Sequence, residues 1–359
     1  MITLVYAVYA VGVVVSLVLA GHLSDAVGRR PMLFAALATN AVSALVFMLA
    51  PSLPGLVTAR VICGLAVGVT ASTATAYLTE LFAAHRPPDQ VRRVQLLASS
   101  TSIGGLGVGG LLGGVVAQTS GHPLVAPYLV VLVLFTACAA ALLLAPETRE
   151  FQRPRPPYRP QRLALPEHAP SRFAAALAGV GSVFALFGLF VGLAATLLHE
   201  TMHRSSLVLS GTVLFVVFGV GVLGAAGAAR LSQRSVVPVA GPVVLTGTAL
   251  LVVSAWLPQP SLAVFLVSAA LIGAGGSALF NASLAVATTL APRAHVAGTV
   301  ATFFLAGYGS LSLPVIGIGV ALEHLSVRVT LLGFAVLVAA AVASALRGLA
   351  RSAPGTGES

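Results

Sequence analysis

The sequence contains no lysine, only two cysteines and few charged residues of either sign. Charged side chains make up 8% of the 359 residues, whereas about a quarter of the residues in a soluble domain are charged. Cys63 and Cys138 both lie within apolar runs, so they do not indicate a disulfide framework. Apolar residues make up 58% of the chain, and its mean hydropathy is +1.01. This composition indicates a protein that lies in a lipid bilayer.

Long apolar runs account for most of the sequence. A helix needs about 20 apolar residues to cross a hydrocarbon core about 30 Å thick. Eleven runs have about this length or more, at residues 2–20, 32–50, 56–78, 94–117, 124–145, 173–198, 207–229, 236–257, 261–290, 296–321 and 327–348. Because backbone amides in lipid must be satisfied within the segment, we expect each run to be an α-helix. The predicted fold class is therefore an all-α membrane protein.

The placement of arginine predicts the orientation of these spans. Sixteen of the 19 arginines lie in alternate connections, whereas the intervening connections contain only Arg204 and Arg328. Arginine-rich loops face the cytoplasm in membrane proteins. We therefore expect a multi-pass protein of the plasma (inner) membrane with Met1 outside and Ser359 in the cytoplasm. Topology accounts for the net charge of +10, so we expect the lipid bilayer, and no nucleic acid, as a partner.

One connection is much longer than the others and divides the chain. Residues 146–172 are rich in proline and arginine, which predicts a cytoplasmic central loop. We expect an N-terminal helical bundle of five spans at residues 1–145 and a C-terminal bundle of six spans at residues 173–350. Residues 351–359 are expected to form a cytoplasmic tail.

The turn at residues 21–30, GHLSDAVGRR, carries the most specific motif. It resembles the signature loop of the major facilitator superfamily, G-x-L-x-D-x-x-G-R-R, which joins the second and third helices of that family. Gly21 and Gly28 permit a tight turn between two helices. The resemblance implies two bundles and 12 spans, of which this chain lacks the first. We therefore expect the natural chain to begin upstream of Met1.

The charged residues of this turn are implied to have a gating role. In the family, the aspartate and arginines that match Asp25, Arg29 and Arg30 hold the two bundles together on the cytoplasmic side. The resemblance implies that Asp25 faces the start of the tenth span here and that Arg29 pairs with an acid at the end of the third. Glu80 lies at that end. The alternative is an ordinary positive turn with a capping aspartate.

Arg60 and Gly64 form a second motif within the third span. They resemble the R-x-x-x-G motif of the family, in which the arginine is associated with proton coupling or substrate charge. An arginine at mid-bilayer costs about 2.5–3.5 kcal/mol on insertion scales, so we expect Arg60 to face a partner or a polar cavity. The alternative is that Arg60, near the outer end of the span, reaches lipid headgroups.

The fourth span contains a run of glycines. Gly105, Gly109, Gly113 and Gly114 resemble the pattern G-x-x-x-G-P-x-x-G-G of drug:proton antiporters, with glycine in place of the proline. Without the proline, the span has no fixed kink. Glycines at i, i+4 and i+8 share one face of a helix, so we expect Gly105, Gly109 and Gly113 to pack tightly against a neighbouring helix.

A zinc-protease motif offers a remote alternative. His199, Glu200 and His203 match H-E-x-x-H, whose histidines bind zinc when the motif lies on a helix. A third ligand would have to come from Glu323 or His324. We expect the motif to lie in a short outer loop, which favours coincidence. The sequence thus predicts no enzyme, no metal site and no cofactor.

The remaining polar and aromatic residues of the spans outline a modest, weakly charged cavity. We expect Thr70, Thr73, Phe187, Asn281 and Tyr308 to contribute to it, although helix packing accounts for each singly. The resemblance implies a monomeric secondary transporter that uses alternating access. We expect proton-coupled efflux of a small hydrophobic or weakly cationic solute. The alternatives are a proton-coupled sugar or metabolite symporter and a non-transporting membrane protein. The apolar runs contain no acid, so the coupling residue is not located.

Overall fold

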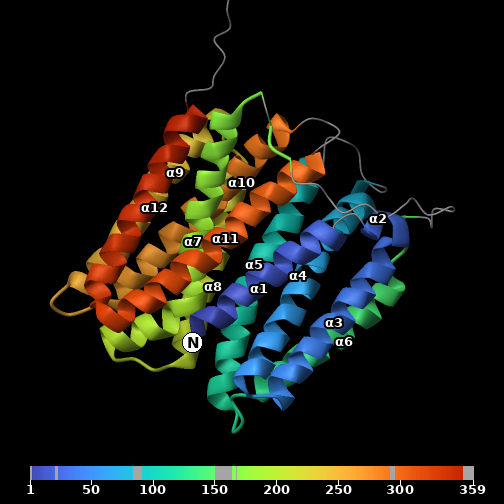
Figure 1. The fold of residues 1–359 in the computed structure, drawn as a ribbon, viewed down its shortest axis with the longest axis horizontal. Coiled ribbons are helices and arrows are strands. Elements are labelled where there is room, and N and C mark those ends of the chain that lie inside the picture. Colours follow the sequence, from blue (N-terminus) through green and yellow to red (C-terminus); the bar gives the residue numbers. More distant parts are fainter. Residues whose placement is uncertain are drawn as a thin grey trace, which may run out of the picture. The chain divides into compact units, whose positions relative to one another are not determined.

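A computed structural model describes residues 2–20, 23–83, 91–149, 164–166, 168–291 and 296–350, and every regular element in these ranges is a helix. The helices are α1 (Ile2–Ala20), α2 (Leu23–Val27), α3 (Arg29–Leu49), α4 (Leu53–Ala83), α5 (Val91–Thr119), α6 (Ala126–Leu144), α7 (Pro170–Met202), α8 (Leu207–Ala228), α9 (Gln233–Trp256), α10 (Leu262–Leu290), α11 (Val296–His324) and α12 (Val327–Ala350) (Figure 1). Gly21, most of the expected central loop and the expected tail lie outside the described residues.

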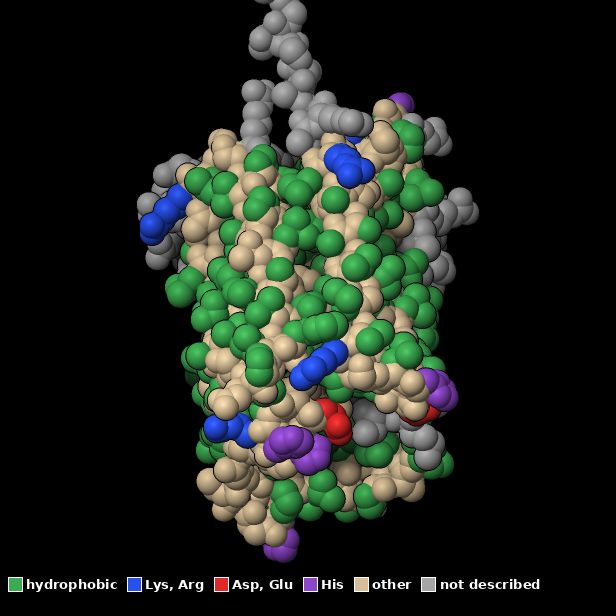
Figure 2. All heavy atoms as spheres, turned by 90° about the vertical axis from the view of Figure 1, so that its left-hand side faces the viewer, with side chains coloured by type: hydrophobic (Ala, Val, Ile, Leu, Met, Phe, Trp, Pro, Cys, Tyr) green, Lys and Arg blue, Asp and Glu red, His purple; other side chains and the backbone are tan. Residues whose placement is uncertain are grey.

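Ten of the described helices, α3 to α12, are long and apolar enough to cross a membrane, and α1 contains a shorter apolar stretch, Val8–Leu17. Figure 2 shows hydrophobic side chains spread over the whole height of one face, with few charged side chains among them. The predicted all-α membrane fold is thus confirmed.

Several helices run further than their apolar sequences indicate, α4 and α7 most of all. The run at residues 56–78 is part of α4, which extends to Ala83 and so includes Glu80. The run itself contains no acid, and Glu80 lies on the part of α4 that extends beyond the run. The run at residues 173–198 is part of α7, which begins at Pro170 and ends at Met202. A proline in the first turn costs no hydrogen bond, because the amides there have no partner within the helix.

The chain divides into two compact units, Met1–Ser102 with Val115–Leu163 and Ile103–Gly114 with Ala164–Ser359. In the first unit α4 packs against α1 and α3, and α3 packs against α6. In the second unit α10 packs in the same way against α8 and α9, and α9 packs against α12. The second unit also contains α7, which packs against α8, α10, α11 and α12 and has no counterpart among the described helices of the first unit.

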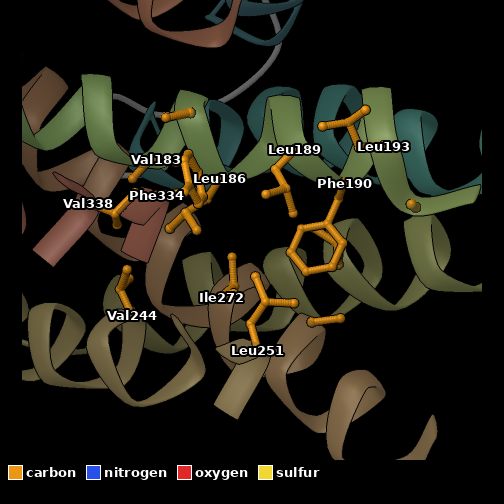
Figure 3. Close-up of a cluster of buried hydrophobic side chains, with 14 of the residues drawn as sticks. Val183, Leu186, Leu189, Phe190, Leu193, Val244, Leu251, Ile272, Phe334 and Val338 are labelled. Carbon is orange, nitrogen blue, oxygen red and sulfur yellow. The ribbon is translucent and has the colours of Figure 1, made fainter. Parts of the chain in front are cut away.

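The core of the second unit forms around α7. Helix α7 is apolar on nearly all sides, which a helix can be only where protein or lipid surrounds it. Its fully buried residues meet those of α9, α10 and α12 (Figure 3). The labelled members of this cluster are Val183, Leu186, Leu189, Phe190, Leu193, Val244, Leu251, Ile272, Phe334 and Val338. Since lipid is itself apolar, close packing rather than water exclusion holds these helices together.

Glycines set the crossing points of the helices. A methyl group on Gly12 of α1 would lie 2.8 Å from the Val61 carbonyl oxygen, and one on Gly64 of α4 would collide with the Tyr9 carbonyl oxygen. In the second unit, Gly273, Gly275 and Gly276 of α10 lie against α8, α9 and α7 respectively. The glycine run at residues 273–276 thus allows three helices to approach α10 closely.

The glycines of α5 pack on a different face from the predicted one. Within the second unit, Gly107, Gly110 and Gly114 lie against Phe218, Leu214 and Leu207 of α8. A methyl group on Gly105, Gly109 or Gly113 would meet no atom of the described structure within 4 Å. The prediction of a tight contact at these three glycines is wrong, because the run has small residues on several faces and a neighbouring helix covers only one of them.

Candidate functional site

Arg29, at the first position of α3, makes a two-point ion pair with Glu80 near the end of α4. One terminal guanidinium nitrogen of Arg29 lies 2.8 Å from Oε1 of Glu80, and Nε lies 3.2 Å from Oε2. The side chain of Arg29 is 6% exposed and that of Glu80 is 25% exposed. Arginine and carboxylate have matching planar geometries, so a pair of this kind fixes both position and orientation. The partner expected for Arg29 is therefore the one that the structure shows.

Three more side chains complete this ion pair. Ser24 accepts a hydrogen bond of 2.5 Å from the other terminal nitrogen of Arg29. The Thr148 hydroxyl donates to Oε2 of Glu80 over 2.6 Å, and Nε of Arg149 donates to Oε1 over 3.1 Å. Both Glu80 oxygens therefore accept two hydrogen bonds each. Glu80 connects α4 to the start of α3 and to the segment that follows α6.

Glu147 caps the N-terminus of α3 from a distant part of the chain. Its Oε1 and Oε2 accept hydrogen bonds from the backbone amides of Arg29 (3.0 Å) and Arg30 (2.9 Å). The first amides of a helix lack partners within it, and a carboxylate there also meets the positive end of the helix dipole. The N-cap residue itself is Gly28, whose φ of 103° disfavours other residues. A Cβ at Gly28 would also lie 3.1 Å from Oε2 of Glu147.

Two further hydrogen bonds secure the segment that carries Glu147. The Tyr77 hydroxyl of α4 donates to the Pro146 carbonyl over 2.5 Å. The guanidinium of Arg30 donates to the Leu143 carbonyl, near the end of α6, over 3.1 Å. We call Arg29, Glu80, Glu147, Thr148 and Arg149 the Arg29–Glu80 cluster. The cluster joins α3, α4 and the end of α6 within the first unit.

The sequence motif predicts only part of this cluster. The resemblance implies roles for Arg29 and Glu80 but none for Glu147, although Glu147 lies in a Pro-Glu-Thr sequence just after a span. That position was the available signal. Gly21 and the side chain of Asp25 lie outside the described residues, and only the backbone of Asp25, in α2, is described. The gating role of these residues stays a prediction.

The two residues of the Arg60 motif face different neighbours. The guanidinium carbon of Arg60 lies 5.3 Å from the centroid of the Phe47 ring of α3, a cation–π distance. Phe47 in turn stacks on Tyr128 of α6, with centroids 5.2 Å apart. Gly64 instead faces α1 and allows that helix to cross α4 closely. The coupling role of Arg60 stays a prediction.

The expected cavity residues are distributed over both units. Thr70 donates to the Ala66 carbonyl of its own helix, and Thr73 is fully buried, with no hydrogen-bond partner for its hydroxyl in the described structure. In the second unit, Asn281 donates to the Ser277 carbonyl over 3.0 Å. Phe187 packs edge to face on Phe218 of α8, and Tyr308 packs in the same way on Phe184 of α7.

The H-E-x-x-H motif lies at the end of α7. Contrary to expectation, His199 and Glu200 are helical, since α7 continues to Met202, but His203 follows the helix with a left-handed φ of 52°. Nδ1 of His199 lies 3.0 Å from the Ser205 hydroxyl. No group of three or more metal-ligating side chains gathers in the ranges that the structure describes.

The helical units and their long apolar helices define the class of protein, an α-helical membrane protein that crosses the bilayer many times. The family model of the Major Facilitator Superfamily matches residues 1–258, and the chain belongs to this family. It is therefore a membrane transporter and not an enzyme.

The fold agrees with this assignment. The crystal structure of the human organic anion transporter MFSD10 (TETRAN) is similar, with a TM-score of 0.69 and 18% sequence identity over 96% of this chain and 83% of that chain. At this identity the likeness concerns the fold alone. No curated protein matches the sequence significantly.

Proposed function

We propose that the protein is a secondary active transporter that exports a small hydrophobic or weakly cationic solute across the plasma membrane in exchange for protons. Family membership supports transport, and the alternating-access mechanism of such folds supports exchange between two faces. The apolar, weakly charged spans support a hydrophobic solute, because a sugar would need many more hydrogen-bonding groups.

The two-point pair between Arg29 and Glu80 is the observation on which this proposal most depends. In alternating access a bundle rocks as a body, so its helices must stay fixed to one another at their ends. The Arg29–Glu80 cluster provides this connection for α3, α4 and the end of α6. We propose that the cluster keeps this end of the first unit rigid while the transporter changes its conformation.

Transport by the Arg29→Ala variant tests the proposal. The full chain and its variant are reconstituted in vesicles, and uptake of a radiolabelled lipophilic cation is followed under an imposed pH gradient. We expect uptake by the wild type and a loss of at least tenfold in Arg29→Ala. Arg204→Ala is the control, because it removes an exposed arginine outside the cluster and should transport normally. Equal transport by wild type and Arg29→Ala would contradict the proposed role of the cluster.

A further inference from the structure

Four aromatic rings in the second unit form a closed circuit of neighbours. Phe184 of α7 lies 5.9 Å from Phe280 of α10, measured between ring centroids. Phe280 lies 6.2 Å from Phe304 of α11, which lies 6.4 Å from Tyr308 one turn further on. Tyr308 closes the circuit at 5.3 Å from Phe184. We call these residues the four-ring cluster.

The four-ring cluster differs from the aromatic core around it. All four rings are half-buried, whereas Phe190, Phe265 and Phe303 are 0–2% exposed. Rings that serve packing alone are expected to be enclosed as these three are. Each residue of the four-ring cluster therefore keeps part of its surface outside the protein core.

The cluster lies near the middle of the membrane. Phe280 precedes the last residue of α10, Leu290, by ten residues, or about 15 Å along the helix. Tyr308 follows the first residue of α11, Val296, by twelve residues, or about 18 Å. These two helix ends are joined by a short connection, so both rings lie at a similar depth. In a hydrocarbon core about 30 Å thick, that depth is close to the midplane.

Tyr308 adds a polar group to the cluster. Its hydroxyl has no hydrogen-bond partner among the residues that the structure describes. A hydroxyl without a partner in an apolar medium costs free energy, and tyrosine in such a place normally finds one. A solute that carries an acceptor group besides its cationic centre would supply this partner, whereas a simple quaternary cation would not.

We propose that the four-ring cluster binds a bulky, weakly hydrated organic cation, such as a quaternary ammonium or phosphonium group. Aromatic faces attract cations within about 6 Å of their centroids, and neighbouring rings here are 5.3–6.4 Å apart, so one cation reaches several rings at once. This inference rests on the proposed function and assigns the solute-binding residues within it.

The absence of a nearby acid defines the chemistry further. In the described parts of α7, α10 and α11 the only acids are Glu200 and Glu323, close to helix ends. A primary ammonium group is strongly hydrated, and rings without a carboxylate would not offset the cost of removing its water. A cation whose charge is shielded by carbon loses little hydration, which is why the cluster favours quaternary and aryl-substituted cations.

Equilibrium binding to the full chain in lipid nanodiscs tests this inference. The probes are radiolabelled tetraphenylphosphonium and tetraphenylborate, a cation and an anion of nearly the same size and shape. Nanodiscs without protein give the non-specific background. We expect saturable binding of the cation and none of the anion.

Substitutions then locate the binding site. Phe184→Leu and Phe304→Leu each remove one ring, and we expect each to weaken cation binding by about three- to tenfold. Tyr308→Phe keeps the ring and should bind the cation as the wild type does. Two matched controls remove rings outside the cluster: Phe215→Leu on an exposed face of α8 and Phe265→Leu in the buried core. Both should retain wild-type affinity.

Fluorinated phenylalanine at position 304 separates ring electrostatics from folding. Successive fluorine atoms keep the size of the ring nearly constant while they reduce the negative charge of its face. We expect affinity for tetraphenylphosphonium to fall stepwise with each added fluorine. Unchanged affinity across this series, or preferential binding of tetraphenylborate, would overturn the inference. If the reconstituted protein transports the lipophilic cation but the substitutions do not change its binding, the assignment of the four-ring cluster fails and the proposed function stands. If the protein transports no cation, the proposed function fails.

Discussion

Arg29 and Glu80 lie 51 residues apart in the sequence and are joined at two points, by hydrogen bonds of 2.8 and 3.2 Å. Arg29 is the more deeply buried partner, so its charge depends on Glu80 for compensation. The pair connects the beginning of α3 to the end of α4, and Thr148 and Arg149 bring the end of α6 to the same place.

We predict that Arg29 and Glu80 are energetically coupled. Arg29→Ala and Glu80→Ala should each lower the melting temperature of the detergent-solubilised protein. Glu80→Ala should lower the melting temperature more than Arg29→Ala does, because the buried guanidinium of Arg29 then loses its ion-pair partner. The double variant should be more stable than the sum of the single effects implies, by about 1–3 kcal/mol. If the effects of the two single variants simply add in the double variant, the interaction between Arg29 and Glu80 does not stabilise the protein.

Removal of the helix cap should also be measurable. Glu147→Ala removes the carboxylate that accepts the first two amides of α3, and caps of this kind contribute about 1 kcal/mol. We expect a lower melting temperature and faster hydrogen exchange of the amides at Arg29 and Arg30. Glu150→Ala, which changes the next carboxylate in the sequence, is the control. Unchanged exchange at the start of α3 would rule out a capping role for Glu147.

The glycines of the spans should differ sharply in their tolerance of alanine. Gly64→Ala should separate α1 from α4 and destabilise the first unit, because its methyl group would collide with the Tyr9 carbonyl. Gly105→Ala should be neutral or stabilising by up to about 1 kcal/mol, since alanine favours a helix and the site is open. Thermal unfolding in the same detergent compares the two. A large loss in Gly105→Ala would mean that another helix covers this face.

Gly28 should not accept a side chain. Its φ of 103° and the nearby Glu147 carboxylate both disfavour alanine there. We expect Gly28→Ala to destabilise the protein by about 1–3 kcal/mol and Gly28→Asn by less, since asparagine tolerates positive φ better. A proteolysis assay of the solubilised protein can rank the stabilities of the wild type and the two variants. Wild-type resistance in Gly28→Ala would contradict the observed turn.

The apolar spans could be predicted from sequence because hydropathy alone determines them, but their ends could not. Helix α4 continues past residue 78 into polar sequence, since a helix needs only backbone hydrogen bonds and Glu80 finds its partners in Arg29, Thr148 and Arg149. In α5 glycines occur on several faces, and the spacing of Gly105, Gly109 and Gly113 does not reveal which face meets a neighbour.

The site was predictable to the extent that its motif is local. The resemblance of residues 21–30 identified Arg29 and implied an acid at the position of Glu80. The cap by Glu147 depends on a contact between residues 118 apart, which no local pattern contains. The four-ring cluster similarly arises from three helices, and Tyr308 is the member that the expected cavity residues include.

Simultaneous recording of solute and proton movement tests the central claim most directly. The full chain is reconstituted in vesicles that contain a pH-sensitive dye, and uptake of radiolabelled tetraphenylphosphonium is measured with no electrical potential across the membrane. The account predicts that each addition of the cation moves protons in the opposite direction, and that Arg29→Ala lowers both movements at least tenfold. Cation movement without proton movement, or movement of both in the same direction, would contradict it.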